Sequence, residues 1–373
     1  MPEPLHTEIP TSCRAAVQVA DRTIEMRTLP VPQTLPPGHA LIRVEACGMC
    51  GSDIEQYHGS VARAGTFSYP AIPGHEPVGR IALMDTATLE RRGLTLGQRV
   101  AVHGTAPCGV CRNCRAGGRC LEAFSYGFRS LEIGFGLWGG YSEYMVITPQ
   151  TKLYPLAEHL SVADAVLFNP LAAGFDWVCR LAQLDVGEDI LILGPGQRGL
   201  ACVIAAREAG AERIIVTGLA RDRPKLALAR ELGATDTIVV DEDDTLTRVL
   251  AITQGRGAHR VVDTTPTSFQ PVTDAIAAAR RGGTLVLAGL KAHTLMPDFP
   301  LDAVIHKQLH LVGALSASDW AVQQAIRAVA GGRYPLHLLH SHTLPITEVE
   351  KAIQLLAGEI EDGTLPLHIT VVP

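Results

Sequence analysis

The sequence predicts an α/β protein with two domains, one irregular and mostly β, the other built on a doubly wound parallel sheet. Three observations lead to this fold class. The chain has 373 residues, about two to three times a typical domain length. Its first part, to about residue 155, is rich in glycine, proline and β-branched residues. From Asp189 onward, short apolar runs alternate with longer helical stretches, as in strands joined by crossover helices.

The first domain is expected to be mostly β because its apolar residues alternate over short runs. Residues 40–44 and 97–102 are examples, and such alternation indicates strands with one buried face. After about residue 315 the chain has too few residues to form a domain of its own. We therefore expect the first domain to comprise residues 1–170 and 316–373. The expected elements of the tail are helices at 319–330 and 346–357 and a strand at 368–372.

The second domain, expected over residues 171–315, contains the regular alternation of strands and helices. Six strands are expected, at residues 190–193, 214–217, 237–240, 260–263, 284–288 and 309–313. The helices between them include 200–209 and 224–232, and each is followed by a glycine, a common helix terminator. Right-handed crossovers through such strands produce a doubly wound parallel sheet.

Composition limits the partners of the chain. Thirty-two Lys and Arg residues against 38 Asp and Glu residues give a net charge of −6, so no overall basic field attracts nucleic acid or anionic lipid. A content of 47% hydrophobic and 19% charged residues excludes a disordered or collagen-like chain. We find no apolar run of about 18 residues and no signal-peptide core. We expect a cytoplasmic protein without a membrane partner, which binds small molecules or copies of itself.

Nine cysteines, an odd number, favour thiolate chemistry in a reducing compartment over a disulfide framework. Four of them lie within 13 residues, at Cys108, Cys111, Cys114 and Cys120. Four thiolates around one ion form a closed tetrahedral zinc site with no open position, so this site is expected to be structural. The alternative is two disulfides or free thiols.

A glycine-rich turn follows the first expected strand of the second domain. Gly194, Gly196 and Gly199 form a GxGxxG pattern between that strand and a helix. The first glycine permits a tight turn, the second lets the backbone approach a pyrophosphate, and the third allows close packing of helix and sheet. We predict a dinucleotide-binding Rossmann domain. The alternative is a glycine-rich turn without a ligand.

The choice between NAD and NADP stays open. At the end of the second strand, Gly218 occupies the place of the acidic residue that usually binds the ribose hydroxyls. Arg221 and Arg223 follow, and a guanidinium can bind a 2′-phosphate through two parallel hydrogen bonds. Alternatively, Asp222 turns inward as the ribose acceptor, and both arginines are merely solvated.

A second group of metal-binding residue types is spread over two segments. The first contains Cys47, Cys50, Ser52 and Asp53, and the second contains His75 followed by Glu76. Cysteine, histidine and a carboxylate with room for water suit an open catalytic zinc site, and Ser52 could carry the proton of an alcohol. Taken separately, the two cysteines could form a redox pair and the histidine could be structural.

In these motifs the chain resembles the zinc-containing medium-chain alcohol dehydrogenase family, in particular its sorbitol and threonine dehydrogenase-like branch. The resemblance covers nearly the whole length. It rests on the motifs at residues 50–53, 74–76, 139–144 and 194–199 and on the four-cysteine lobe, in the family's order. It implies a GroES-like catalytic domain completed by the C-terminal segment around a Rossmann cofactor domain, and a homodimer or homotetramer.

The resemblance also implies roles for individual residues. Cys50, rather than Cys47, and His75 would bind the catalytic zinc, and Glu76 would be a ligand or lie next to one. Ser52 would bond the substrate oxygen and relay its proton. One catalytic zinc, one structural zinc and NAD or NADP are then the expected cofactors.

Three departures from the family pattern affect these expectations. Asn169 stands where the family has a further zinc ligand or water holder, and a neutral amide is a poor zinc ligand. It would then hydrogen-bond the water instead, with Asp53 as another residue outside the ligand shell. Glu55 replaces the usual relay histidine three residues after Ser52, and only five residues separate Cys114 from Cys120, where seven are usual.

The sequence thus predicts a zinc-dependent NAD(P) alcohol dehydrogenase that oxidises a primary or secondary alcohol, or reduces the carbonyl. Aromatic residues between Leu121 and Trp138 favour an apolar alcohol over a polyol, or else merely pack the shortened lobe. Two rival predictions remain. One is a zinc-free quinone or enoyl reductase of the same superfamily, and the other is a non-catalytic NAD(P)-binding protein that retains the fold.

Overall fold

The computed structural model describes residues 8–63, 67–118, 120–292 and 294–373. The chain divides into two compact units, one formed by Met1–Leu167 with Leu339–Pro373, the other by Phe168–Leu338. Residues 1–7, which we assigned to the first domain, lie outside the described residues.

The first unit is built on a seven-stranded sheet in the order β16-β17-β3-β4-β5-β9, with β8 also paired to β3. Two small ladders, β1-β2 and β6-β7, accompany it. The strands of this unit are β1 (Ser12–Ala20), β2 (Thr23–Pro30), β3 (Ala40–Met49), β4 (Glu76–Met84), β5 (Arg99–Val102), β6 (Thr105–Ala106), β7 (Phe124–Ser125), β8 (Tyr144–Ile147), β9 (Leu153–Pro155), β16 (His342–Pro345) and β17 (Ile369–Val372). Its α-helices are α1 (Gly51–Tyr57), α2 (Ser60–Arg63), α3 (Thr86–Arg92), α4 (Arg112–Arg115), α5 (Val162–Val166) and α13 (Val349–Ala357).

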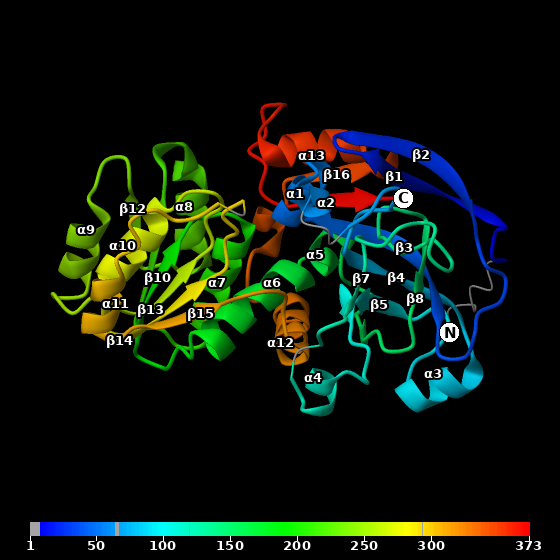
Figure 1. Cartoon of the computed structure of the whole chain (residues 1–373), viewed down its shortest axis with the longest axis horizontal. Coiled ribbons are helices and arrows are strands. Elements are labelled where there is room, and N and C mark those ends of the chain that lie inside the picture. The colour runs from blue at the N-terminus through cyan, green and yellow to red at the C-terminus, as the bar shows by residue number, and fades with distance from the viewer. Residues whose placement is uncertain (1–7, 64–66, 119, 293) are drawn as a thin grey trace. The chain divides into compact units, whose positions relative to one another are not determined.

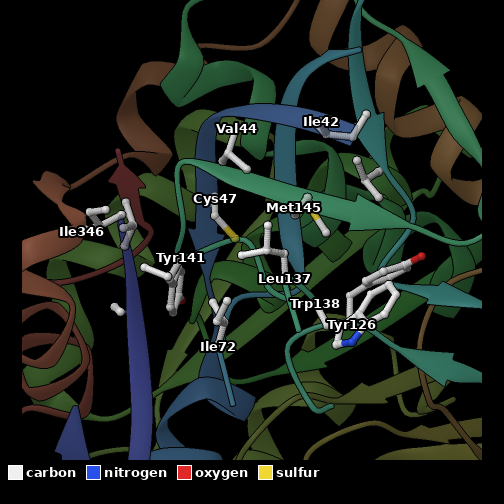
Figure 2. Close-up of a cluster of buried hydrophobic side chains, with 14 of the residues drawn as sticks. Ile42, Val44, Cys47, Ile72, Tyr126, Leu137, Trp138, Tyr141, Met145 and Ile346 are labelled. Atoms are coloured by element: carbon white, nitrogen blue, oxygen red, sulfur yellow. The ribbon is translucent and has the colours of Figure 1, made fainter. Parts of the chain in front are cut away.

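The C-terminal tail joins this sheet, since β17 pairs antiparallel with β3. Apolar residues of β3 contribute to a core formed also by residues from the loops before β4 and β8. Figure 2 shows part of this core, with Cys47 among Ile42, Val44 and other apolar side chains. β3 and β4 hold the two segments of candidate metal ligands in fixed register, because Gly48 on β3 lies opposite Glu76 on β4.

The second unit contains a six-stranded sheet in the order β12-β11-β10-β13-β14-β15 (Figure 1), and every neighbouring pair is parallel. Its strands are β10 (Asp189–Leu193), β11 (Arg213–Gly218), β12 (Asp236–Val239), β13 (Ala258–Asp263), β14 (Ala279–Leu287) and β15 (His310–Gly313). Its α-helices are α6 (Phe168–Phe175), α7 (Gln197–Glu208), α8 (Arg223–Leu232), α9 (Thr245–Ile252), α10 (Gln270–Ala278), α11 (Leu301–Lys307) and α12 (Asp319–Ala330).

The central strands of this parallel sheet are buried on both faces, as in doubly wound folds. Every residue of β10 is buried. Leu191 and Leu193 of β10 pack with apolar residues of α9 and α10. α7 contacts β10 and β11, α8 contacts β11 and β12, and the two helices contact each other. The strand order reverses between β10 and β13, which is where such sheets bind dinucleotides. The predicted combination of a mostly β domain and a Rossmann sheet is confirmed.

The structure moves the second division of the chain from the expected 315/316 to 338/339. The physical reason is that α12 packs against α6 of the second unit. Ser318, which caps α12, donates a hydrogen bond to Asp176 at 2.5 Å, and Tyr334 donates one to Glu208. The first division lies at 167/168 rather than 170/171.

The helical run Val162–Leu181 was absent from our expectations. It has 20 residues and a mean hydropathy of 1.2, enough by length and composition alone to cross a membrane. However, 72% of the tested window is buried inside the protein, as in the core helix of a soluble protein. The run is therefore weak support for a membrane span.

Candidate functional site

The turn from β3 into α1 positions Cys50 and Ser52. Cys50 has an extended backbone as the N-cap of α1, and its N–H donates a 2.9 Å hydrogen bond to Asp53 Oδ2. A carboxylate at the third helical position satisfies one of the N–H groups that a helix start leaves unpaired. This bond fixes the turn, so the Cys50 thiol and the Ser52 hydroxyl emerge on the same side.

The turn before β4 positions His75 and Glu76. Gly74 has a φ of +89°, and a Cβ there would lie 2.7 Å from the ring of Tyr141, so only glycine fits. The opposite strand makes room for Glu76 in the same way. A Cβ on Gly48 would lie 2.7 Å from Glu76 Oε2.

These two turns bring Cys50, His75 and Glu76 together. One ligand atom from each lies within 4.8 Å of the other two, and Cys50 Sγ lies 3.2 Å from His75 Nε2. The Ser52 hydroxyl oxygen lies 2.8 Å from Cys50 Sγ and 3.3 Å from His75 Nε2. Thiolate, imidazole and carboxylate are the ligand types that zinc binds in proteins.

The charges around this cluster also suit a cation. Asp53 and Glu76 are both fully buried. Burial lowers the pKa of His75, but the neighbouring Cys50 and Asp53 outweigh it and leave that pKa well above its usual value. Burial raises the pKa of the Tyr141 hydroxyl, and the acids Asp53 and Glu76 raise it further. The residues present therefore fit a divalent metal.

Four other predicted residues fall in distinct environments. Asp53 Oδ1 lies 3.5 Å from His75 Nδ1, where it can orient the ring. Glu55 on α1 accepts a 2.6 Å hydrogen bond from the Ser60 hydroxyl. Cys47 is completely buried in the core of the first unit, and burial raises its pKa well above the usual value. Asn169 belongs to α6 in the second unit, where its amide oxygen accepts a hydrogen bond from Arg198.

The four cysteines of the lobe also converge. Their sulfurs all lie within 4.8 Å of one another, with 3.5 Å between Cys108 and Cys120 and 4.0 Å between Cys111 and Cys120. A tetrahedron with zinc–sulfur bonds of about 2.3 Å has edges of about 3.8 Å between sulfurs. A disulfide would need about 2.05 Å. The chain's nine cysteines all lie in described residues, and each is a free thiol.

Backbone groups around the lobe stabilise thiolates. N–H groups of Leu121 and Cys114 lower the pKa of Cys111 to about 6, and the N–H of Cys108 contributes most to a lowered pKa of Cys120. Burial, together with contacts to Cys111 and Cys120, raises the pKa of Cys114 to about 12. Without a metal, Cys111 and Cys120 lose their protons more easily than an ordinary thiol, and Cys114 less easily. A bound cation would stabilise all the thiolates, because metal-bound thiols are deprotonated.

The glycine-rich turn has the geometry expected of a dinucleotide site. Gly194 has a φ of +96°, and a Cβ on Gly199 would lie 1.9 Å from the carbonyl oxygen of Gly194. Gly196 is the N-cap of α7 and provides no side-chain cap. The first N–H groups of α7 are thus not capped by its N-cap residue, and with the positive end of the helix dipole they favour a phosphate.

The residues at the end of β11 and after it differ in whether their side chains already have partners within the protein. A Cβ on Gly218 would lie 2.9 Å from Pro195 in the glycine-rich turn. Asp222 Oδ2 accepts a hydrogen bond from the Leu219 N–H. Arg223 binds Glu242 through both carboxylate oxygens. Arg221 is exposed, so of the two predicted arginines it is the better placed to meet a ligand.

Comparison with known proteins decides the family. The model of the alcohol dehydrogenase GroES-like domain matches residues 36–158, and that of the zinc-binding dehydrogenase matches residues 199–331. A Mycobacterium tuberculosis protein named "Probable alcohol dehydrogenase" is 39% identical, with 96% of this chain and 98% of that protein covered. The chain belongs to the zinc-containing medium-chain alcohol dehydrogenase family. It is a zinc-dependent oxidoreductase that acts on CH–OH groups, so the predicted family, enzyme class and function are confirmed.

Other members of this dehydrogenase family are also similar. The sorbitol dehydrogenase of Bacillus subtilis is 33% identical over 78% of this chain and 79% of its own length. A crystal structure of an alcohol dehydrogenase from Thermotoga maritima has a TM-score of 0.86 at 24% identity, covering 98% of this chain and all of that one. A zinc-binding dehydrogenase from Sinorhizobium meliloti, bound to NADP, has a TM-score of 0.83 at 24% identity, covering 98% and 100%.

Two more residues lie near the candidate metal cluster of this dehydrogenase, and one of them, His368, escaped sequence analysis. His368 is fully buried with no hydrogen-bond partner for either ring nitrogen, and its Nε2 lies 3.9 Å from Glu76 Oε2. Almost 300 residues separate the two, and no sequence pattern pairs them. Phe128 lies with its ring centroid 5.4 Å from that of His75. The other aromatics that we singled out pack on one another, for example Phe124 and Phe135 on Trp138.

Proposed function

We propose that Cys50, His75 and Glu76 hold the catalytic zinc of this dehydrogenase, and that Ser52 takes the proton of the alcohol. The observation that carries this proposal is the position of the Ser52 hydroxyl, in contact with both Cys50 Sγ and His75 Nε2. The chemistry that zinc supplies at such a site is polarisation of the substrate oxygen, which acidifies an alcohol. A hydroxyl next to two ligands is then within reach of the proton.

The surrounding residues support these roles. In this proposal Asp53 orients the His75 ring from the Nδ1 side, as carboxylates commonly do for histidine ligands. Glu55, one helical turn after Ser52 and bonded to Ser60, accepts the proton on its way to solvent. Asn169 would remain outside the ligand shell, because an amide is a poor ligand and its oxygen already accepts a hydrogen bond from Arg198.

We further propose that Cys108, Cys111, Cys114 and Cys120 hold a second, structural zinc. Sulfur separations close to those of a zinc tetrahedron support this role. With four protein ligands the ion has no open position, so this lobe would stabilise the fold without taking part in turnover. Thiolates kept for two metal sites also suit the reducing cytoplasm that the sequence suggested.

For the cofactor, we propose that the turn at Gly194, Gly196 and Gly199 binds the pyrophosphate of NAD(P). Gly218 leaves no acid to repel a 2′-phosphate, and Arg221 is exposed beside it. The Asp222 carboxylate already caps its own turn, which makes it a less suitable ribose acceptor. The proposal is that NADP is accepted, with Arg221 as its phosphate contact. The hydride chemistry itself belongs to the cofactor.

Self-association through the edge of the parallel sheet completes the proposal. β15 is an edge strand of the sheet, and such edges are usually covered. Large apolar residues in β15 and in the chain segments before and after it are exposed, namely Leu290, Leu295, Phe299, Leu301, Ile305, Leu311 and Leu315. A homodimer or homotetramer would cover them. A monomer in light scattering at micromolar concentration contradicts this assembly.

The substrate proposed is a primary or secondary alcohol with an apolar group. Phe128 beside His75 supports an apolar neighbour for the reacting carbon. The sorbitol dehydrogenase relative provides the contrasting possibility of a polyol. A panel of apolar alcohols and polyols, assayed with NAD and NADP before and after zinc removal, tests the proposal.

Three outcomes of that panel are informative. Turnover of apolar alcohols that disappears with a chelator and returns with zinc supports the proposed function. Reduction of enones that survives complete zinc removal would favour the zinc-free reductase. Tight NAD(P)H binding without turnover of any alcohol or carbonyl would favour the non-catalytic NAD(P)-binding protein.

A further inference from the structure

A lysine that is only partly exposed lies beside the glycine-rich turn of the second unit and has no role in the proposed function. Lys291 follows β14, and its Nζ lies 2.8 Å from Asp263 Oδ2 at the end of β13. The Lys291 side chain is 15% exposed and that of Asp263 is 0% exposed. Lysine is rarely buried unless it is paired, so this ion pair needs an explanation.

The Lys291 ammonium makes two hydrogen bonds besides its ion pair. Nζ donates to the carbonyl oxygen of Thr265 at 2.6 Å and to its hydroxyl at 3.2 Å, and Asp263 Oδ2, which accepts no hydrogen bond, is its counter-ion. The Thr265 hydroxyl and N–H both donate to Asp263 Oδ1. Lys291 therefore ties Asp263 and Thr265 together through one ion pair and two hydrogen bonds.

Thr264 and Thr265 contact the glycine-rich turn directly. The hydroxyl of Thr264 donates to the carbonyl oxygens of Leu193 at 2.8 Å and Gly194 at 3.1 Å. A Cβ on Gly194 would lie 2.9 Å from the Thr265 methyl group and 3.0 Å from the Thr264 hydroxyl. The two threonines thus form the wall that sets the path of the turn.

The residues just after β14 bond to Asp263 from the other side, and we call residues 263–265 with these neighbours the corner. The N–H groups of Ala288 and Gly289 donate to the carbonyl oxygen of Asp263, and a Cβ on Gly289 would lie 2.0 Å from the carbonyl oxygen of Thr265. The corner lies at the carboxyl ends of β13 and β14, beside the point between β10 and β13 where the strand order reverses. Dinucleotides bind at this edge of such sheets.

We propose that Lys291 is a positioning residue for the dinucleotide, acting through Asp263, Thr264 and Thr265 on the turn at Gly194. This inference rests on the proposed function, in which that turn binds NAD(P). A phosphate bound by backbone N–H groups depends on their directions, and the corner fixes those directions. The contact is at the turn shared by both cofactors, far from Arg221 in sequence, so NADH and NADPH should depend on it equally.

The test is the dissociation constant for NADH and NADPH, measured by fluorescence titration in the full-length protein. Lys291→Met is expected to weaken both about tenfold or more, the loss typical of a charge-assisted bond. Lys291→Arg, which keeps the charge, should recover part of the affinity. The wild-type dissociation constants serve as the reference. If the wild type binds neither NADH nor NADPH, the proposed function is refuted, whereas the ratio of each variant's dissociation constant to that of wild type tests this inference.

Lys307 offers a matched control. Its ammonium donates to three backbone carbonyls, those of Ile276, Ala277 and Ala279, and it also lies in the second unit. It makes none of the contacts with the corner described above. Lys307→Met should lower the melting temperature without changing either dissociation constant by more than about twofold.

A double variant separates the effect of Lys291 on protein stability from its effect on cofactor binding. Asp263→Asn with Lys291→Met removes both buried charges and should restore much of the melting temperature, while the affinity stays low. Thr264→Val, which keeps the volume but loses the bonds to Leu193 and Gly194, should reproduce the weaker binding even if Lys291→Met fails to fold. The inference is overturned if these folded variants bind both cofactors as wild type does, or if Lys307→Met loses as much affinity.

Discussion

The hydroxyl oxygen of Ser52 lies 2.8 Å from the sulfur of Cys50. One helix start provides both groups, and the Asp53 carboxylate fixes it by accepting the Cys50 N–H. The proposed proton acceptor is therefore held next to a proposed metal ligand by local backbone geometry alone.

Replacing Ser52 by Ala should lower kcat by about 10² to 10⁴, the usual contribution of a positioned acid–base group. The zinc content should stay as in wild type, because Ser52 is not a proposed ligand. Ser52→Thr should recover part of the rate. Steady-state rates and elemental zinc analysis on all three proteins are the measurements. Gly51→Ala is the control, because Gly51 lies in α1 and a Cβ there meets nothing within 4 Å. A rate loss as large as that of Ser52→Ala would show that α1 as a whole matters instead.

Gly48 is predicted to be essential for the position of Glu76. In Gly48→Ala the new Cβ would lie 2.7 Å from Glu76 Oε2 and 3.0 Å from His368 Nε2, so the carboxylate must move. Overpacking a core typically costs about 1 to 3 kcal/mol. We expect weaker zinc binding in a competition titration and a lower melting temperature.

Gly51→Ala is the matched control for Gly48, since a Cβ there meets nothing within 4 Å and lies inside α1. Alanine should leave stability unchanged or raise it by about 0.4 to 1 kcal/mol. Equal zinc affinity in the two variants would mean that Glu76 has room to move and is not a ligand.

The cysteine lobe should lose its metal when one sulfur is removed. Cys114→Ser is predicted to bind about one zinc fewer per chain and to unfold at a lower temperature, because a structural site contributes folding energy directly. Cys179→Ser, at a half-buried thiol of the second unit, should keep the full metal content. Unchanged zinc content and stability in Cys114→Ser would rule out a zinc site in the lobe.

Arg221 and Arg223 should differ in their effect on cofactor choice. Arg221→Ala is expected to lower the affinity for NADPH about ten- to a hundredfold and to leave that for NADH unchanged. Arg223→Ala should do much less, because Glu242 already binds that guanidinium. Dissociation constants for both cofactors decide the matter. An NADH preference above about a thousandfold in wild type, unaffected by either change, would mean that another group replaces the missing acid.

The fold could be predicted because its signals are local. Strand–helix alternation identified the parallel sheet, and the glycine turn at Gly194 and Gly199 has the close approaches that its spacing implies. The boundary near residue 316 could not be predicted in the same way. It depends on α12 packing against α6, two helices about 145 residues apart whose contact no local pattern encodes.

In the candidate sites too, the residues with local sequence signals could be predicted and those with remote partners could not. Cys50, His75, Glu76 and the four lobe cysteines carry recognisable spacings, and the structure brings each set together. His368 and Lys291 carry no such signal, because their partners come from strands remote in sequence. Asn169 shows the limit of motif reading, since its hydrogen bond to Arg198 had no counterpart in the pattern that drew attention to it.

The central claim is that Cys50, not Cys47, holds a catalytic zinc in this dehydrogenase. The most direct measurement is zinc per chain, together with alcohol turnover and NAD(P)H binding, in wild type, Cys50→Ala and Cys47→Ala. We expect two zinc ions in wild type, one in Cys50→Ala with turnover abolished and NAD(P)H binding retained, and two in Cys47→Ala with turnover largely kept. Two zinc ions and full turnover in Cys50→Ala, or equal losses in both variants, would contradict it.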